Sequence, residues 1–230
     1  GHYARLSPAA AEGGVRLQRG LDATKDQSYF LFTLTQAQLA RALFPVGAMR
    51  KAEVRETARE LGLAVAEKPD SQELCFVPDG DTARLVDALS PTRPARGPIR
   101  DLEGNDLGEH PGVHHFTVGQ RKGLGVSAPV PLYVVELDAD EQAVTVGPRA
   151  ALERTQLTAS NVNWIAGHPP SSPRVTARIR HRHPDAAARV ELLDAARVAV
   201  HFDEPQTAVA PGQAAVFYDG ETVLGGGWID

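Results

Sequence analysis

The sequence is poor in cysteine and has no long hydrophobic run. Its single Cys among 230 residues cannot form an intramolecular disulfide, which favours a reducing compartment. No apolar stretch approaches the roughly 18 residues that a membrane span requires. No charged-then-apolar leader opens the chain either. These absences predict a cytoplasmic protein with no membrane partner.

An initiator methionine is also absent. The chain opens Gly1-His2-Tyr3-Ala4-Arg5, as an excised piece of a longer protein does. The formal net charge of -5 argues against a protein that coats nucleic acid, yet it leaves room for a local basic patch. The length and the hydrophobic fraction of 42% suffice for one large or two modest domains with a buried core.

Helical periodicity is confined to the first ninety residues. Thr35 is typical of an N-cap, and the helix that follows should stop at Pro45. A second helix has a narrow apolar stripe that ends at Leu61, and Gly62 stands where a left-handed C-terminal cap is expected. A third helix is predicted over 81–89.

After Pro91 short alternating runs replace the helical period. The turn 103–106 predicts a hairpin. From residue 133 the spacing of turn signals predicts a small antiparallel barrel or sandwich. Its expected strands are 132–137, 143–147, 157–164, 174–182, 188–193, 197–202, 214–218 and 222–229. The fold class is therefore α+β and multidomain: an α/β remnant over 1–34, a mixed helical and β central domain over 35–132, and an antiparallel β-barrel over 133–230.

Cys75 follows a polar segment and lies in a short apolar run. It could be a small buried hydrophobe or a reactive thiolate, which needs nearby positive charge or backbone donors. The absence of a Cys-x-x-Cys spacing predicts neither zinc binding nor thioredoxin-like chemistry. The pairs His114-His115 and His181/His183 lack the carboxylate or thiolate spacing of a metal site, so we expect no metal.

The expected strand 174–182 carries the clearest electrostatic pattern. Period-two alternation places four arginines on one face, namely Arg174, Arg178, Arg180 and Arg182. Guanidinium groups suit phosphate because they offer a planar fork of donors. An edge strand that uses charge to block aggregation would show the same pattern.

Eight blocks in this chain resemble, in order, those of the bacterial tRNA-specific 2-thiouridylases. The blocks are Gly1-His2-Tyr3-Ala4-Arg5, Lys25-Asp26-Gln27-Ser28-Tyr29-Phe30-Leu31, Leu43-Phe44-Pro45-Val46-Gly47, Lys68-Pro69-Asp70-Ser71-Gln72-Glu73-Leu74-Cys75-Phe76, Gly119-Gln120-Arg121-Lys122-Gly123-Leu124-Gly125, Pro211-Gly212-Gln213, Phe217-Tyr218-Asp219-Gly220 and Leu224-Gly225-Gly226-Gly227-Trp228-Ile229. Together they cover nearly the whole chain.

The resemblance implies an ATP-dependent sulfurtransferase. Enzymes of this family activate the C2 oxygen of the wobble uridine with ATP and replace it with sulfur carried as a cysteine persulfide. Cys75 matches the persulfide carrier. The implied partners are tRNA and an upstream sulfur donor, either a cysteine desulfurase or a sulfur relay protein. Residues 1–34 would then be the end of an ATP-pyrophosphatase domain.

The resemblance also implies binding residues. Gly1 matches a residue at the nucleotide site and His2 one that touches tRNA. Further tRNA contacts match Lys25, Asp26, Gln27, Arg180, His181 and Gln213, with Arg178 and Arg182 as weaker candidates. Without the resemblance, Lys25-Asp26-Gln27 would read as a solvated loop and Gln213 as a polar turn residue.

Two family elements do not occur in this sequence: the Ser-Gly-Gly-x-Asp-Ser phosphate loop and a second cysteine. We therefore expect ATP with Mg²⁺ to bind mainly outside this chain, no tightly bound cofactor within it, and no activity from the chain alone. The alternative is an RNA-binding β-domain module in which Cys75 is inert.

Overall fold

The structure, a computed structural model, describes residues 2–8, 14–68, 77, 82–90 and 95–230. It comprises two compact units. The barrel unit contains residues 1–68, 155–205 and 210–230, and the central unit contains residues 69–154 and 206–209. The central unit therefore interrupts the barrel unit in the sequence.

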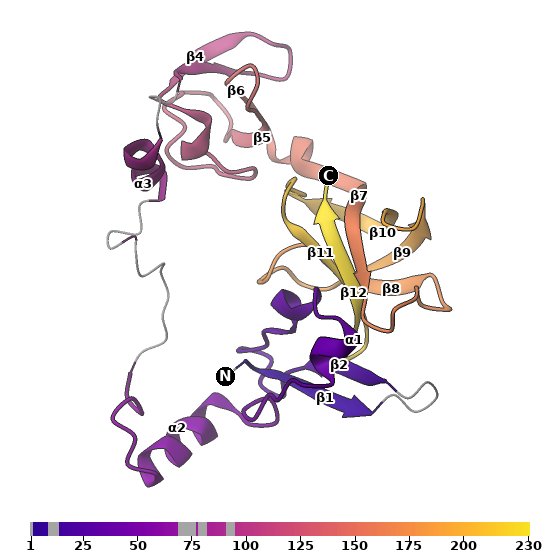
Figure 1. The fold of residues 1–230 in the computed structure, drawn as a ribbon. Helices are drawn as coiled ribbons and strands as arrows, with labels where there is room; N and C mark the ends of the chain where they lie inside the picture. Colours follow the sequence, from indigo (N-terminus) through magenta and orange to yellow (C-terminus); the bar gives the residue numbers. More distant parts are fainter. Residues whose placement is uncertain (1, 9–13, 69–76, 78–81, 91–94) are drawn as a thin grey trace. The chain divides into compact units, whose positions relative to one another are not determined.

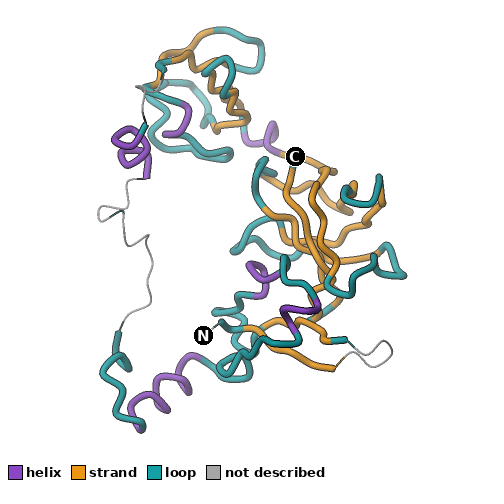
Figure 2. Tube along the Cα trace, in the orientation of Figure 1, coloured by secondary structure: helices purple, strands orange, loops and turns teal. Residues whose placement is uncertain are grey.

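The barrel unit is mostly β-structure (Figure 2). Its strands, labelled in Figure 1, are β1 (Ala4–Pro8), β2 (Val15–Arg19), β7 (Glu153–Trp164), β8 (Arg174–Arg178), β9 (Ala186–Leu192), β10 (Val198–Thr207), β11 (Ala214–Asp219) and β12 (Thr222–Ile229). Its helices are η1 (Ser28–Leu31), α1 (Gln36–Leu39) and α2 (Lys51–Glu60).

Six of these strands close into a barrel. Their order is β12-β11-β8-β9-β10-β7, and an additional pairing of β12 with β7 completes the ring. The hairpin of β1 and β2 extends the same sheet from β12, where Gln18 pairs with Thr222. The predicted antiparallel barrel is thus confirmed. Closure removes the free sheet edges that β12 and β7 would otherwise expose.

Strand β11 is buried on both of its faces. Every residue from Ala214 to Tyr218 is buried. Ala214, Val216 and Tyr218 belong to a core cluster with Leu17 of β2 and Leu39 of α1. Ala215 and Phe217 alternate with them and lie on the opposite face. The N-terminal elements therefore cover the outside of the barrel at β11.

Glycines allow β12 to approach its neighbours closely. A Cβ atom on Gly226 would lie 2.7 Å from the Ala215 carbonyl oxygen, and one on Gly227 would lie 2.7 Å from the Ser160 carbonyl oxygen. Real side chains do not tolerate such distances to backbone. The glycine run of β12 therefore packs directly against the backbone of its neighbours.

The central unit contains a four-stranded sheet. Its elements are α3 (Thr82–Leu89), β3 (Gly97–Arg100), β4 (Asp106–His110), η2 (Val113–His115), β5 (Tyr133–Asp138), β6 (Ala143–Gly147) and η3 (Arg149–Leu152). The strand order is β4-β3-β6-β5, and β3 runs parallel to β6. Ile99, Phe116 and Val144 are among the residues that form its core. The predicted hairpin is confirmed, with Gly104 in the left-handed region at φ 85°.

The domain boundaries differ from those expected. The barrel domain was predicted to begin at residue 133, but β5 pairs with β6 and β6 pairs with β3, so both strands lie in the central sheet. Barrel strands begin only with β7. Residues 35–68, predicted to lie in the central domain, belong to the barrel unit. Alternating hydrophobicity identifies a strand but does not state which sheet it joins.

The helices agree with the sequence prediction at some of their ends and not at others. Thr35 caps α1 through a capping box with Gln38, as predicted, but α1 ends at Leu39, well before Pro45. Helix α2 ends beside Gly62 (φ 65°) as expected, and it buries none of its residues. In the part of the chain that the structure describes, no helix has the length and apolar character to cross a membrane.

Candidate functional site

Asp26 anchors the Lys25-Asp26-Gln27 segment within the barrel unit. Its side chain is buried. The carboxylate accepts hydrogen bonds from the Gly20 N–H (3.0 Å), the Ser28 N–H (3.1 Å) and the Ser28 hydroxyl (2.9 Å). Because three donors inside the protein already use these oxygens, Asp26 fixes the shape of the segment.

Gln27 and His2 lie at the start of β1. The Gln27 N–H donates to the Tyr3 carbonyl (3.0 Å), and the Tyr3 N–H donates to Gln27 Oε1 (3.1 Å). His2 is exposed, and its ring lies edge-on to Phe44 with centroids 6.5 Å apart. Lys25 is half-buried. Gln27 thereby ties the segment to the first strand.

Two arginines and two aspartates form a cluster beside Tyr218, here called the Arg–Asp cluster. The Asp185 carboxylate forms ion pairs with Arg19 Nη2 at 2.6 Å and with Arg178 Nε at 2.9 Å. Asp26 lies 3.9 Å from Arg19 Nη1 and 3.6 Å from Arg178 Nη1. The Arg19 Cζ atom lies 3.6 Å from the centroid of the Tyr218 ring. Because the charged groups of this cluster are largely shielded from water, they stabilise the fold only while each has an oppositely charged partner.

The predicted arginine face does not exist as one strand face. Strand β8 ends at Arg178, and the chain then turns, with the His183 N–H donating to the Arg180 carbonyl at 3.1 Å. Arg178 belongs to the Arg–Asp cluster, whereas Arg182 is exposed in the turn. The prediction of a strand to 182 was wrong because arginine alternation continues past the point where pairing with β9 and β11 stops.

His181 and Phe30 form an aromatic pair at the surface. Their rings lie 4.7 Å apart at an interplanar angle of 35°, and 55% of Phe30 is exposed. Burial lowers the pKa of His181, and nearby guanidinium groups lower it further. Its Nδ1 has no hydrogen-bond partner among the residues that the structure describes. An exposed phenyl ring beside a partly buried imidazole is a surface on which a nucleobase can stack.

Tyr29 connects this aromatic pair to β11. Its hydroxyl donates to the Ala214 carbonyl at 2.8 Å, and burial raises its pKa to about 12. Its ring lies 6.1 Å from that of His181. Gln213, next to Ala214, is exposed in a turn that follows Gly212 (φ 78°). The aromatic pair and the Gln213 turn are thus joined through Tyr29.

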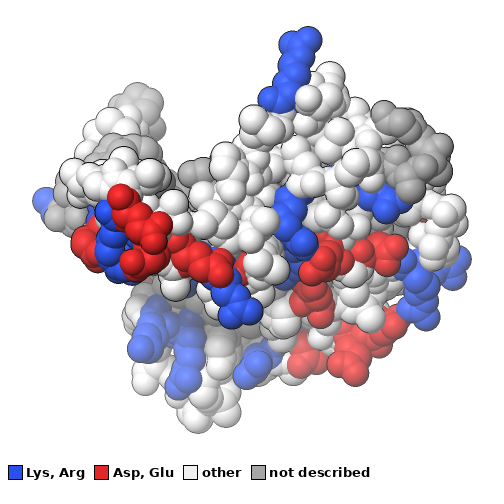
Figure 3. All heavy atoms as spheres, turned by 90° about the horizontal axis from the view of Figure 1, so that it is seen from below, with Lys and Arg blue, Asp and Glu red and all other residues white. Residues whose placement is uncertain are grey.

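Two segments singled out by the sequence therefore lie side by side, although about 150 residues separate them. Asp26 reaches Arg178, and Phe30 reaches His181. Gly1 and Cys75 lie outside the residues that the structure describes. On the face drawn in Figure 3, acidic and basic side chains are intermingled, in keeping with the net charge of -5.

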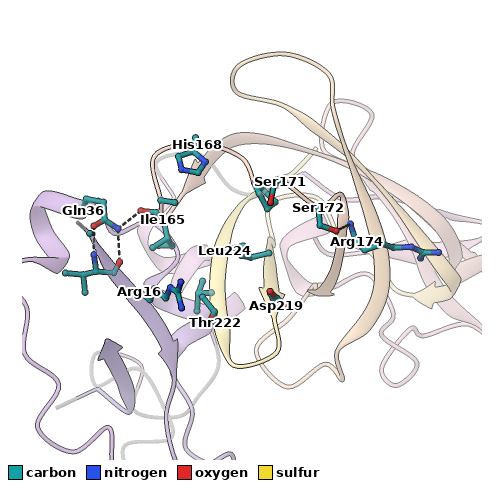
Figure 4. A pocket seen from close by; sticks show the side chains of 15 residues that line it. Arg16, Gln36, Ile165, His168, Ser171, Ser172, Arg174, Asp219, Thr222 and Leu224 are labelled. Atoms are coloured by element: carbon teal, nitrogen blue, oxygen red, sulfur yellow. Dashed lines mark hydrogen bonds between the residues drawn. The ribbon is translucent and has the colours of Figure 1, made fainter. Parts of the chain in front are cut away.

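A second feature of the barrel unit is a cavity of about 830 Å³ (Figure 4). It is lined by residues of β2, α1, β8, β11, β12 and the chain after β7. The Gln36 side chain connects two parts of the lining. Its Nε2 donates to the Val15 and Ile165 carbonyls, and its Oε1 accepts from the Val15 N–H. Arg174 forms a two-bond ion pair with Asp203. The sequence holds no signal for this cavity, since its lining comes from elements that are far apart in the sequence.

The central unit brings a carboxylate to the His114-His115 pair. Asp87 Oδ1 lies 2.9 Å from His114 Nε2, and Asp87 Oδ2 lies 3.3 Å from His115 Nε2. The two imidazole centroids are 4.3 Å apart. Sequence spacing missed this cluster because Asp87 precedes His114 by 27 positions.

Known proteins resemble the whole of this chain. Three family models match it: a "tRNA methyl transferase HUP domain" over 1–79, a "tRNA methyl transferase PRC-barrel domain" over 88–148 and an "Aminomethyltransferase beta-barrel domain" over 154–229. The tRNA-specific 2-thiouridylase MnmA of Geotalea uraniireducens is 52% identical over all of the chain, and those of Solibacter usitatus and Syntrophotalea carbinolica are 52% and 49% identical.

This chain belongs to the tRNA-specific 2-thiouridylase family. It covers 61%, 64% and 64% of the length of these three relatives, respectively. The family assignment confirms the resemblance drawn from the eight sequence blocks. The PRC-barrel match holds the central sheet and the barrel match begins at β7, whereas the HUP match over 1–79 covers the N-terminal part of the barrel unit and extends past its limit at residue 68.

Proposed function

We propose that this chain is part of an enzyme that transfers sulfur to C2 of a uridine in tRNA. One observation carries the proposal: enzymes named tRNA-specific 2-thiouridylase are about half identical to this chain over its full length. The runner-up, an RNA-binding module with an inert cysteine, has no comparable support.

Cys75 would carry the sulfur as a persulfide. ATP first converts the C2 oxygen of the uridine into a leaving group. The outer sulfur of the Cys75 persulfide then attacks C2, and the activated oxygen departs. A second thiol breaks the sulfur–sulfur bond by attacking the Cys75 sulfur, which leaves a disulfide on the protein and the new sulfur on the base. The chain has one Cys, so that second thiol lies outside these 230 residues.

The tRNA contacts would lie around the aromatic pair and the turn after β8. We propose Arg180, His181, Gln213, Lys25 and His2 as contacts, with Phe30 as a stacking partner. Asp26, Gln27 and Arg178 are proposed to position them, because their polar groups are bonded within the protein. Arg182, exposed in the same turn, is proposed to meet phosphate.

Further requirements follow from this chemistry. We propose that ATP with Mg²⁺ binds mainly to residues outside this chain, with Gly1 at the margin of that site. A cysteine desulfurase or a sulfur relay protein would supply the sulfur, in the cytoplasm. On this proposal the chain by itself does not thiolate tRNA, and no membrane is involved.

Sulfur loading of Cys75 tests the proposal. Incubation with a cysteine desulfurase and cysteine should increase the mass of the chain by one sulfur atom, measured by mass spectrometry. Cys75→Ser should abolish that increase, and the full-length Geotalea uraniireducens relative is the positive control. A chain that stays unloaded while the relative is loaded would support the inert-cysteine alternative instead.

A further inference from the structure

Helix α3 presents a carboxylate to two consecutive histidines of η2. Asp87 lies near the end of α3, and His114 and His115 form the last turn of η2. Both Nε2 atoms point at the same carboxylate, at 2.9 Å and 3.3 Å. The three ligand atoms all lie within 4.8 Å of one another.

This set of atoms has the composition of a zinc site. Zn²⁺ takes imidazole nitrogen and carboxylate oxygen at about 2.0–2.2 Å, and tetrahedral geometry then places neighbouring ligand atoms about 3.3 Å apart. The two histidine nitrogens lie 2.9 Å and 3.3 Å from the two oxygens of the Asp87 carboxylate, so the three side chains are within reach of one shared ion. The side chains are partly open to solvent, with exposed fractions of 18% for His114, 30% for His115 and 42% for Asp87. Water can therefore reach the fourth position.

We propose that Asp87, His114 and His115 bind a Zn²⁺ ion, with water as the fourth ligand. The ion would link α3 to η2, two elements that are separated in the sequence by β3 and β4. Helix α3 begins seven positions after Cys75. A metal link would thus hold one end of the chain segment that contains the cysteine. This proposal stands apart from the proposed sulfur transfer, since no part of it requires tRNA or a persulfide.

The test is a titration of the metal-free 230-residue chain with Zn²⁺, and with Co²⁺ as a spectroscopic probe. Wild type should bind one equivalent, show the visible absorption of four-coordinate Co²⁺, and melt at a higher temperature with Zn²⁺. Asp87→Asn, His114→Gln and His115→Gln should each weaken binding by about tenfold or more, since loss of a ligand costs at least as much as loss of its supporting partner.

Two controls separate this site from adventitious binding. His183→Gln removes a histidine of the barrel unit and should leave the affinity unchanged. Cys75→Ser should also bind normally, and Co²⁺ spectra should lack sulfur charge-transfer absorption. Circular dichroism checks that each variant is folded. Equal metal binding by wild type and the three ligand variants would overturn the proposal. Failure of the wild-type chain to bind metal would also overturn it. In either case the contacts of Asp87 with the two histidines would be hydrogen bonds and nothing more.

Discussion

At the scale of single residues, Asp26 shows how a carboxylate next to a binding segment can serve the fold. It accepts three hydrogen bonds and faces two guanidinium groups while almost wholly buried. Among the residues that the structure describes, removal of its charge would leave Asp185 as the carboxylate that pairs with Arg19 and Arg178. The Arg–Asp cluster is therefore a structural element of the proposed interface.

We expect Asp26→Asn to lower the free energy of unfolding by about 2–3 kcal/mol. Breaking a buried ion pair typically costs about 3–5 kcal/mol, and here Asp185 still compensates in part. Asp203→Asn is the matched control, because Asp203 also pairs with an arginine of β8 but at an exposed site. It should cost less than about 1 kcal/mol. Urea unfolding measures both, and equal losses would show that Asp26 is no more important than a surface carboxylate.

Sequence reasoning reached the right segment but not the role of each residue. It selected Lys25-Asp26-Gln27 and the arginines near residue 180, and the structure places these segments together. It could not show that Asp26 is buried, because that depends on Arg178 and Asp185 more than 150 positions away. Phe30 was read only as part of a family block, since its exposure depends on the tertiary fold.

At the scale of elements, β12 approaches β11 too closely for a side chain at Gly226. Gly226 has no room for a methyl group between the Ala215 carbonyl and the Phe32 ring, each 2.7 Å from an added Cβ. We expect Gly226→Ala to destabilise the barrel unit by about 3 kcal/mol or more, because overpacking against backbone cannot relax by a rotamer change.

Gly212→Ala is the control for that substitution. Gly212 has a φ of 78° and open space around it, so alanine there should cost only about 1 kcal/mol of backbone strain. Tryptophan fluorescence can follow both, because the two tryptophans, Trp164 and Trp228, are in the barrel unit. If both variants unfold at the same urea concentration, the packing argument fails.

Element positions were predictable from the sequence where clear turn signals bound a strand at both ends. Strands β11 and β12 begin and end within a residue of their predicted limits. Strand β8 was predicted four residues too long, because its arginine alternation runs into a turn. β5 and β6 were assigned to the wrong domain for another reason: β5 pairs with β6, and β6 pairs with β3, which is distant in sequence and cannot be identified from the local pattern.

At the scale of the whole molecule, tRNA binding should respond to charge and stacking in different ways. Each phosphate contact contributes about one unit to the slope of log affinity against log salt. Replacement of Arg180 and Arg182 with Ala should therefore flatten that slope by about two units, if both meet phosphate. Titrations of tRNA at several salt concentrations measure it. Arg178 is left in place because the Arg–Asp cluster needs it.

Two further variants separate the contribution of charge to tRNA binding from that of stacking. Arg174→Ala removes an arginine that is paired with Asp203 at the other end of β8 and should leave the slope unchanged. Phe30→Ala should weaken binding by about tenfold or more with no change of slope, because stacking releases no counterions. A double arginine variant with the slope of wild type would move the search for phosphate contacts to Lys25, Arg121 and Lys122.

The pairing of β12 with both β7 and β11 has a consequence for synthesis on the ribosome. Ring closure, and the contact of the β1–β2 hairpin with Thr222, must wait until the last strand has emerged. The central sheet uses only strands between residues 97 and 147, so it can form some eighty residues earlier. During that interval β1 and β2 have no completed barrel to join. Until β12 has been synthesised, nascent chains of this protein therefore present open strand edges, which are prone to aggregation.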